Sequence, residues 1–182
     1  MGHLGSVIDE KIRQFIAAQH VFFVASAPLD PHGHVNLSPK GLDTLRVLSP
    51  RRVAYLDLTG SGNETAAHAG VDGRATLMFC SFTRNPLILR LYGRVKTGVL
   101  GSALWSELSQ RFAALPGARQ IVAMNIESAQ TACGFGVPLM RLESERTTLT
   151  DYWLAKGEAE TEEYRKRENS VSIDGLPGWG AE

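Results

Sequence analysis

The stretch that decides the fold is residues 53–68, VAYLDLTGSGNETAAH, where an apolar strand runs into a Gly/Ser/Asn turn and then a short helix. β-Branched and aromatic residues favour a packed strand over 53–58. The turn that follows is rich in small polar residues, and Asn63 and Glu64 are residue types that suit the start of a helix. A strand ending in such a turn at a helix start can hold an anion, because backbone N–H groups and the helix dipole both favour negative charge.

Working outward from this stretch, the pattern predicts one domain, residues 1–182, that is mainly β with peripheral helices. Helical spacing predicts helices from a cap at Ser6, with Asp9 in capping-box position, to His20, and over 101–114 and 149–167. Strands are predicted at 21–25, from Val35, and at 53–58, 74–82, 86–97 and 122–126. Six strands joined mostly by short turns favour a six-stranded antiparallel barrel, because a doubly wound sheet needs a helix between successive strands.

Composition narrows the classes of function. Lys plus Arg total 19 and Asp plus Glu total 19, so the absence of a basic excess argues against nucleic-acid binding. No apolar run approaches the roughly 20 residues of a membrane helix, and no secretion signal is apparent at the start, so the expected location is the cytoplasm. The two cysteines, Cys80 and Cys133, form no CxxC pair, and neither a disulfide framework nor a zinc site is expected.

A second motif, HVNLSPKG at residues 34–41, contains a lysine that could bind an anionic ligand. Asn36, Ser38 and Lys40 share one side of a strand by its two-residue alternation. Lys40 is either a surface lysine in a turn or a cation at the mouth of the barrel, facing an anionic ligand. Three polar groups on one face of the strand favour a ligand-binding site, although this pattern leaves both interpretations of Lys40 open.

The turn after the third predicted strand has two interpretations as well. Asn63 can be an ordinary helix cap that needs no ligand. Alternatively Ser61, Gly62, Asn63 and Thr65 form an anion cradle that donates to a phosphate, although the charge of Glu64 would repel one unless it points away.

The remaining candidates are weaker. Cys133 and Gly134 begin a glycine-punctuated loop, CGFGVP, which is either a packed turn or a cofactor contact. His32 and His34 lie two apart in a turn without further ligands, so no metal site is predicted. No Ser/His/Asp or Cys/His arrangement can be assembled, and no catalytic residue is identified.

Taken together, these motifs resemble the pyridoxamine 5′-phosphate oxidase-related family of FMN-binding split barrels. The resemblance rests on VNLSPKG, YLDLTGSGNET, GRATLMFCSF, LILRLYGRV and ACGFGVP, with SIDGLP near the end similar to a bacterial subgroup. It implies a six-stranded split barrel that forms a homodimer, with FMN at the interface. The turn at 61–65 would then hold the phosphate, the side chains of Asn36, Ser38 and Lys40 would line the ring or ribitol, and the loop at Cys133 and Gly134 would approach from the partner subunit.

The chain departs from the oxidase of that family at the phosphate turn. Gly62 and Asn63 stand where the oxidase has an Arg-Lys pair, so pyridoxamine phosphate oxidase activity itself is not expected. Two hypotheses remain. The first is an FMN-dependent oxidoreductase acting on a small substrate, and the second is a non-catalytic binding protein holding another ligand, such as haem, or none.

Overall fold

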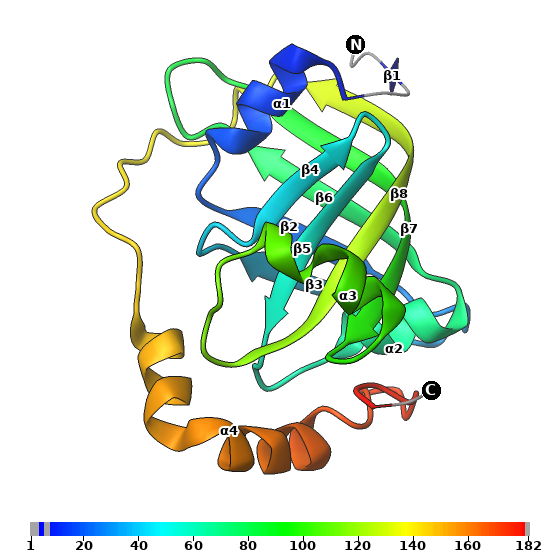
Figure 1. Cartoon of the computed structure of the whole chain (residues 1–182). Helices are drawn as coiled ribbons and strands as arrows, with labels where there is room; N and C mark the ends of the chain where they lie inside the picture. Colours follow the sequence, from blue (N-terminus) through cyan, green and yellow to red (C-terminus); the bar gives the residue numbers. More distant parts are fainter. Residues whose placement is uncertain (1–3, 6–7, 181–182) are drawn as a thin grey trace.

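The computed structural model describes residues 4–5 and 8–180, which form one antiparallel sheet with four α-helices around it (Figure 1). The strands run in the order β3-β2-β6-β7-β8-β5-β4, and β1 pairs with β8. Their bounds are Leu4–Gly5 (β1), Phe22–Ser26 (β2), Asn36–Lys40 (β3), Leu45–Ser49 (β4), Arg52–Leu58 (β5), Arg74–Cys80 (β6), Ile88–Val99 (β7) and Ala118–Ala132 (β8). Because β3 and β4 are the two ends of this path, the curled sheet is a barrel split between them.

The prediction of a mainly β antiparallel barrel is confirmed, but the count of six strands is wrong. The structure adds β4 and the two-residue β1. The sequence of Leu45–Ser49, LRVLS, lacks the clear apolar alternation of a strand with one core face, and all five residues are half-buried in the structure. Pairing with β5 makes it a strand, and that is a long-range contact.

The helices are Glu10–Ala17 (α1), Glu64–Val71 (α2), Ala103–Leu108 (α3) and Thr148–Glu168 (α4), with a 3-10 turn at Ser109–Arg111. Asp9 was predicted to lie three residues after the cap of the first helix, and this is wrong. Asp9 is itself the N-cap of α1, and its side chain accepts the N–H of Ile12. Ser6 lies outside the described residues. α4 is two helices joined at Gly157, whose φ of 75° interrupts the predicted continuous helix.

Two apolar clusters share the sheet. The larger one fills the barrel and includes Val53 and Tyr55 of β5, whereas Ala54 and Leu56 face a second cluster outside it. Leu108 of α3 covers this outer cluster, and Trp153 of α4 is also buried. Other apolar side chains of α4 are exposed, among them Tyr152 (48%) and Leu154 (70%).

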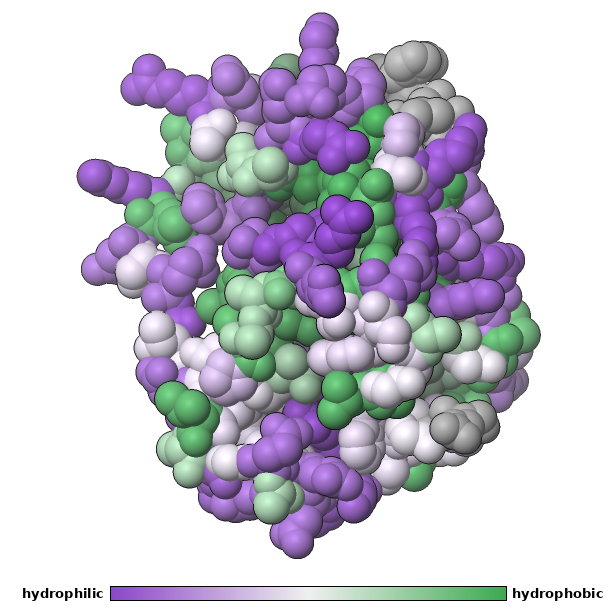
Figure 2. All heavy atoms as spheres, viewed as in Figure 1, coloured by the Kyte–Doolittle hydropathy of each residue, from purple (hydrophilic) through white to green (hydrophobic). Residues whose placement is uncertain are grey.

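The outer surface is mixed in character. Figure 2 shows apolar residues interspersed across the middle of one face, whereas its upper and lower rims are hydrophilic. Within the described residues, no helix is both long and apolar enough to cross a membrane.

Candidate functional site

A pocket of about 290 Å³ lies where the ends of β3 and β5 meet the start of α2. Seven of the nine site residues predicted from the sequence line it: Asn36, Ser38, Lys40, Ser61, Gly62, Asn63 and Thr65. The side chains of β3 that face it alternate with exposed ones, as the two-residue period predicted. The two loop motifs, 20 or more residues apart in sequence, are thus brought into one site.

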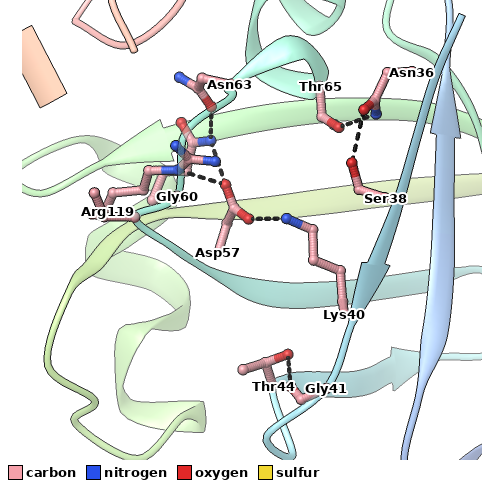
Figure 3. A network of polar contacts seen from close by, with 12 residues as sticks. Asn36, Ser38, Lys40, Gly41, Thr44, Asp57, Gly60, Asn63, Thr65 and Arg119 are labelled. Carbon is pink, nitrogen blue, oxygen red and sulfur yellow. Dashed lines mark hydrogen bonds and ion pairs between the residues drawn. The ribbon is translucent and has the colours of Figure 1, made fainter. Parts of the chain in front are cut away.

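The ammonium group of Lys40 is anchored by a buried carboxylate (Figure 3). Its Nζ donates to Oδ1 of Asp57 at 2.6 Å, and the Asp57 side chain is only 2% exposed. Asp57 lies on β5 beyond the part of that strand that β4 pairs with, so Lys40 reaches it across the split in the barrel. The side chain of Lys40 stays 22% exposed and lines the pocket. Lys40 is therefore a positioned cation rather than a free surface lysine.

The other oxygen of Asp57 holds two residues of β8. Oδ2 accepts from Nε of Arg119 at 2.8 Å and from Nε2 of Gln120 at 2.9 Å. Burial alone would raise the pKa of Asp57, but the charges of Arg119 and Lys40 and the hydrogen bonds of Lys40 and Gln120 outweigh it. The pKa of this carboxyl is consequently held well below its usual range, and Asp57 is a fixed anion that orders two cations.

Arg119 is a residue of the candidate site that the sequence did not predict. It is almost fully buried, lines the pocket, and donates from Nη1 to Oδ1 of Asn169 at 2.9 Å. Its only sequence signal is a pair of polar residues, Arg119 and Gln120, that immediately precedes an apolar strand run. Two other arginines near the turn, Arg74 and Arg94, pair with Asp72 instead.

The first turn of α2 opens onto the pocket without a side-chain cap. Asn63 occupies the N-cap position but makes no capping hydrogen bond, so its interpretation as an ordinary cap is wrong. Its Oδ1 accepts from Gln120 at 2.8 Å and its Nδ2 donates to the carbonyl of Asn169 at 3.5 Å. The N–H groups of Ala66 and Ala67 donate to the carbonyl of Asn63 at 3.1 and 3.3 Å. The two N–H groups before them, of Glu64 and Thr65, are therefore the ones that this helix start offers to an anion.

A hydrogen-bond network connects the β3 side of the pocket to α2. Asn36 Nδ2 donates to the hydroxyl oxygens of Thr65 at 3.1 Å and Ser26 at 3.2 Å, and Asn36 Oδ1 accepts from Ser38 at 2.7 Å. The Thr65 hydroxyl therefore accepts a hydrogen bond from β3 at the edge of the pocket. Behind this layer, Ser26 contacts Nδ1 of His68 at 2.9 Å, and burial lowers the pKa of that imidazole.

The last two predicted site residues lie elsewhere in the chain. Cys133 is exposed, and neither Cys133 nor Gly134 lines the pocket. Gly134 has a φ of 64°, and a Cβ there would meet the backbone of Leu87 at 3.0 Å, so the chain is tightly packed at this position, whereas Phe135 next to it is 81% exposed. His34 bonds to Asp174, and among residues 4–5 and 8–180 no group of three metal-ligating side chains gathers.

Comparison with known proteins agrees with this architecture. Residues 8–133 match the family model described as pyridoxamine 5′-phosphate oxidase. The chain is 38% identical over 190 residues to the pyridoxamine 5′-phosphate oxidase family protein ustO of Aspergillus flavus, covering 94% of this chain and 75% of that protein.

Two solved structures share the fold at low sequence identity. HupZ of Group A Streptococcus superposes with a TM-score of 0.52 at 18% identity, over 67% of this chain and 91% of HupZ. A protein related to general stress protein 26, of the pyridoxinephosphate oxidase family, from Clostridium acetobutylicum gives 0.52 at 12% identity, over 69% and 91% of the two chains. The sequence matches and this shared fold together show that the chain belongs to the pyridoxamine 5′-phosphate oxidase family.

Proposed function

We propose that the protein binds FMN in this pocket and acts as an oxidoreductase on a small substrate. The observation that carries the proposal is the uncapped first turn of α2, which faces the same pocket as the ammonium group of Lys40. An anion is the natural ligand of such a site, because both groups offer N–H donors and positive charge.

The residues present fit the phosphate end of FMN. The hydroxyl of Thr65 and the first backbone N–H groups of α2 would hold the phosphate, with Lys40 and Arg119 beside them. Gly60 and Gly62 border open space, since a Cβ at either position would meet no atom within 4 Å, so the backbone is open to a ligand. Arg119 supplies positive charge where the turn itself lacks the basic pair of the oxidase.

The size of the pocket suits a head group rather than a whole dinucleotide. Ligand sites commonly range from about 300 to 1,000 Å³, and this pocket of about 290 Å³ is at the lower end. A larger apolar groove of about 1,180 Å³ adjoins it at Lys40 and includes Phe23, Phe82 and Tyr152. An aromatic ring attached to a phosphate in the pocket would extend toward this groove.

When bound, FMN would supply hydride or electron transfer, and the protein would supply binding, orientation and electrostatics. Lys40 lines both the pocket and the groove, and Asp57 fixes its position. Asp57 itself is kept ionised by two cations, and His68 is buried behind Ser26, so both act structurally in this proposal.

A homodimer is part of the same proposal. Leu37 on the edge strand β3 is 65% exposed, and Leu139, Met140 and Leu142 are also exposed on the segment that links β8 to α4. A second copy would cover these residues, and it would bring the loop of Cys133 and Gly134 to the site of its partner.

The competing function is a non-catalytic binding protein. It is favoured by the carboxylates of Asp57 and Glu64, which balance the charges of Lys40 and Arg119 around the pocket. The absorbance spectrum of the purified protein, taken before and after addition of FMN, separates the two. Flavin bands that shift on binding, and that bleach when a reductant is added and return when a substrate is supplied, support the oxidoreductase. A haem spectrum, or no change with FMN, supports the binding protein.

A further inference from the structure

The tail, residues 169–180, contacts both walls of the candidate site. At its start, Asn169 is fully buried, accepts from Arg119 at Oδ1, and donates from Nδ2 to the carbonyl of Gly60 at 2.9 Å. Further on, Asp174 accepts the backbone N–H of His34 at 2.8 Å and lies 2.6 Å from its ring Nδ1. The tail thereby connects the loop before α2 with the residues that lead into β3, and Figure 1 shows it ending beside α2.

Between these two anchors, the tail contacts the one acidic residue in the first turn of α2. The backbone N–H of Ile173 donates to both carboxylate oxygens of Glu64, at 3.2 and 3.3 Å. Glu64 lines the pocket, and its charge would oppose an anion at the helix start. The contact directs that carboxylate to the tail.

The geometry of the tail presents this N–H group outward. Ser172 Oγ accepts the N–H groups of Asp174 and Leu176, and Gly175 N–H donates to the carbonyl of Ser172. Residues 172–175 thus form a tight turn with Ile173 at its second position, and Gly175 has a φ of 75°. The side chain of Ile173 is 71% exposed, so its backbone rather than its side chain makes the functional contact.

We propose that the tail is a positioning element of the anion site, in which the N–H of Ile173 holds the Glu64 carboxylate away from the ligand. The inference rests on the proposed function, because it deepens the account of the same pocket. With the carboxylate held in this way, a pocket bordered by an acidic helix start can accept a phosphate group.

The chain offers a matched pair of variants to test this. Ile173→Pro removes the N–H group, and proline is favoured at the second position of such a turn, so the turn is expected to survive. Ile173→Ala removes the side chain but keeps the N–H group. Both are made alone and together with Glu64→Gln, and thermal melting confirms that each variant is folded.

Two probes are titrated into each variant: inorganic phosphate, followed by amide chemical shifts in the first turn of α2, and FMN, followed by calorimetry. Ile173→Ala should bind both like the parent. Ile173→Pro should bind both more weakly, on the order of 5- to 20-fold, as expected when a unit charge approaches an anion in partly solvated surroundings. In the Glu64→Gln background, Ile173→Pro should have no effect, because there is no charge left to hold away.

Each outcome decides the proposal. Equal affinities of Ile173→Pro and Ile173→Ala would overturn it, and so would a loss that persists in the Glu64→Gln background, since that loss would be structural. If phosphate binds with the predicted pattern but FMN does not bind, the tail keeps its role and the FMN proposal fails. If the parent binds neither probe, both proposals fail.

Discussion

Replacing Asp57 with Asn should lower stability and strengthen anion binding at once. The substitution keeps the shape of the side chain but leaves the charges of Arg119 and Lys40 without their counter-ion. In the parent protein, Lys40, Arg119 and Gln120 all donate to the carboxylate of Asp57. In the variant, the amide NH₂ group would face one of these donors and could not accept its hydrogen bond. The two properties move in opposite directions because Asp57 stabilises the same cations whose charge it neutralises.

The magnitude follows from burial. Breaking a buried ion pair from one side costs about 3–5 kcal/mol. Lys40 is partly exposed and can regain water, so the lower end, about 3 kcal/mol, is expected. With a typical urea dependence of roughly 2 kcal/mol per molar, the unfolding midpoint should fall by about 1.5 M. Affinity for FMN should rise, by up to about tenfold, because the pocket gains one net positive charge.

The assay is urea unfolding followed by circular dichroism, with calorimetry of FMN binding on the folded variant. Asp151→Asn, which changes an exposed carboxylate in the first turn of α4, is the control and should cost less than about 1 kcal/mol. An unchanged midpoint for Asp57→Asn would refute the account of the network. A folded variant that no longer binds FMN would refute the assignment of Asp57 as an anchor that neutralises the pocket.

The depressed pKa of Asp57 also predicts that the stability of the protein falls at acidic pH. The pKa of this carboxyl is depressed in the folded protein relative to about 3.9 in an unfolded chain. Its contribution to stability is therefore complete above about pH 4 and is lost as the pH falls toward the folded-state pKa. The stability difference between the parent and Asp57→Asn should narrow below pH 4 in urea titrations, and a difference that stays constant down to pH 2 would contradict this reasoning.

Three further predictions concern the pocket, the packing of α4 against the barrel and the assembly. Thr65→Ala should cost about 0.5–1.5 kcal/mol of FMN affinity and narrow the preference for FMN over riboflavin, whereas Lys40→Ala should cost roughly 1.5–3 kcal/mol, both measured by calorimetry. If Lys40→Ala binds FMN as tightly as the parent, the lysine is not a ligand contact. Gly117→Ala should lower the free energy of unfolding by about 1–3 kcal/mol, because the backbone there has a φ of 79° and a Cβ would meet the Trp153 ring at 2.3 Å. Light scattering should give a dimer, and a stable monomer of 19.8 kDa at micromolar concentration would contradict that prediction.

The local sequence pattern was sufficient to predict the strand, turn and helix that form the candidate site. The strand–turn–helix at residues 53–68 and the polar face of residues 36–40 follow from side-chain alternation and turn chemistry, and the structure places both motifs at one pocket. These signals are local, since each depends on residues within a few positions of one another.

The features that sequence reasoning missed depend on distant contacts. Arg119 and Asp57 are 62 positions apart, and Asn63 meets Asn169 across 106 positions, so no local pattern encodes either pair. Asn63 is a good capping residue by type, yet its side chain is recruited by Gln120 and leaves the helix uncapped. The direction of Glu64 likewise depends on the tail, 109 residues away.

The most direct test of the central claim compares FMN with riboflavin, which differ only in the phosphate that the pocket is proposed to hold. Calorimetric titration of the purified protein should give a clearly higher affinity for FMN, and raising the salt concentration should reduce that preference because charge contributes to it. Equal affinity for the two flavins, or binding of neither, would contradict the claim that the start of α2 and Lys40 form a phosphate site.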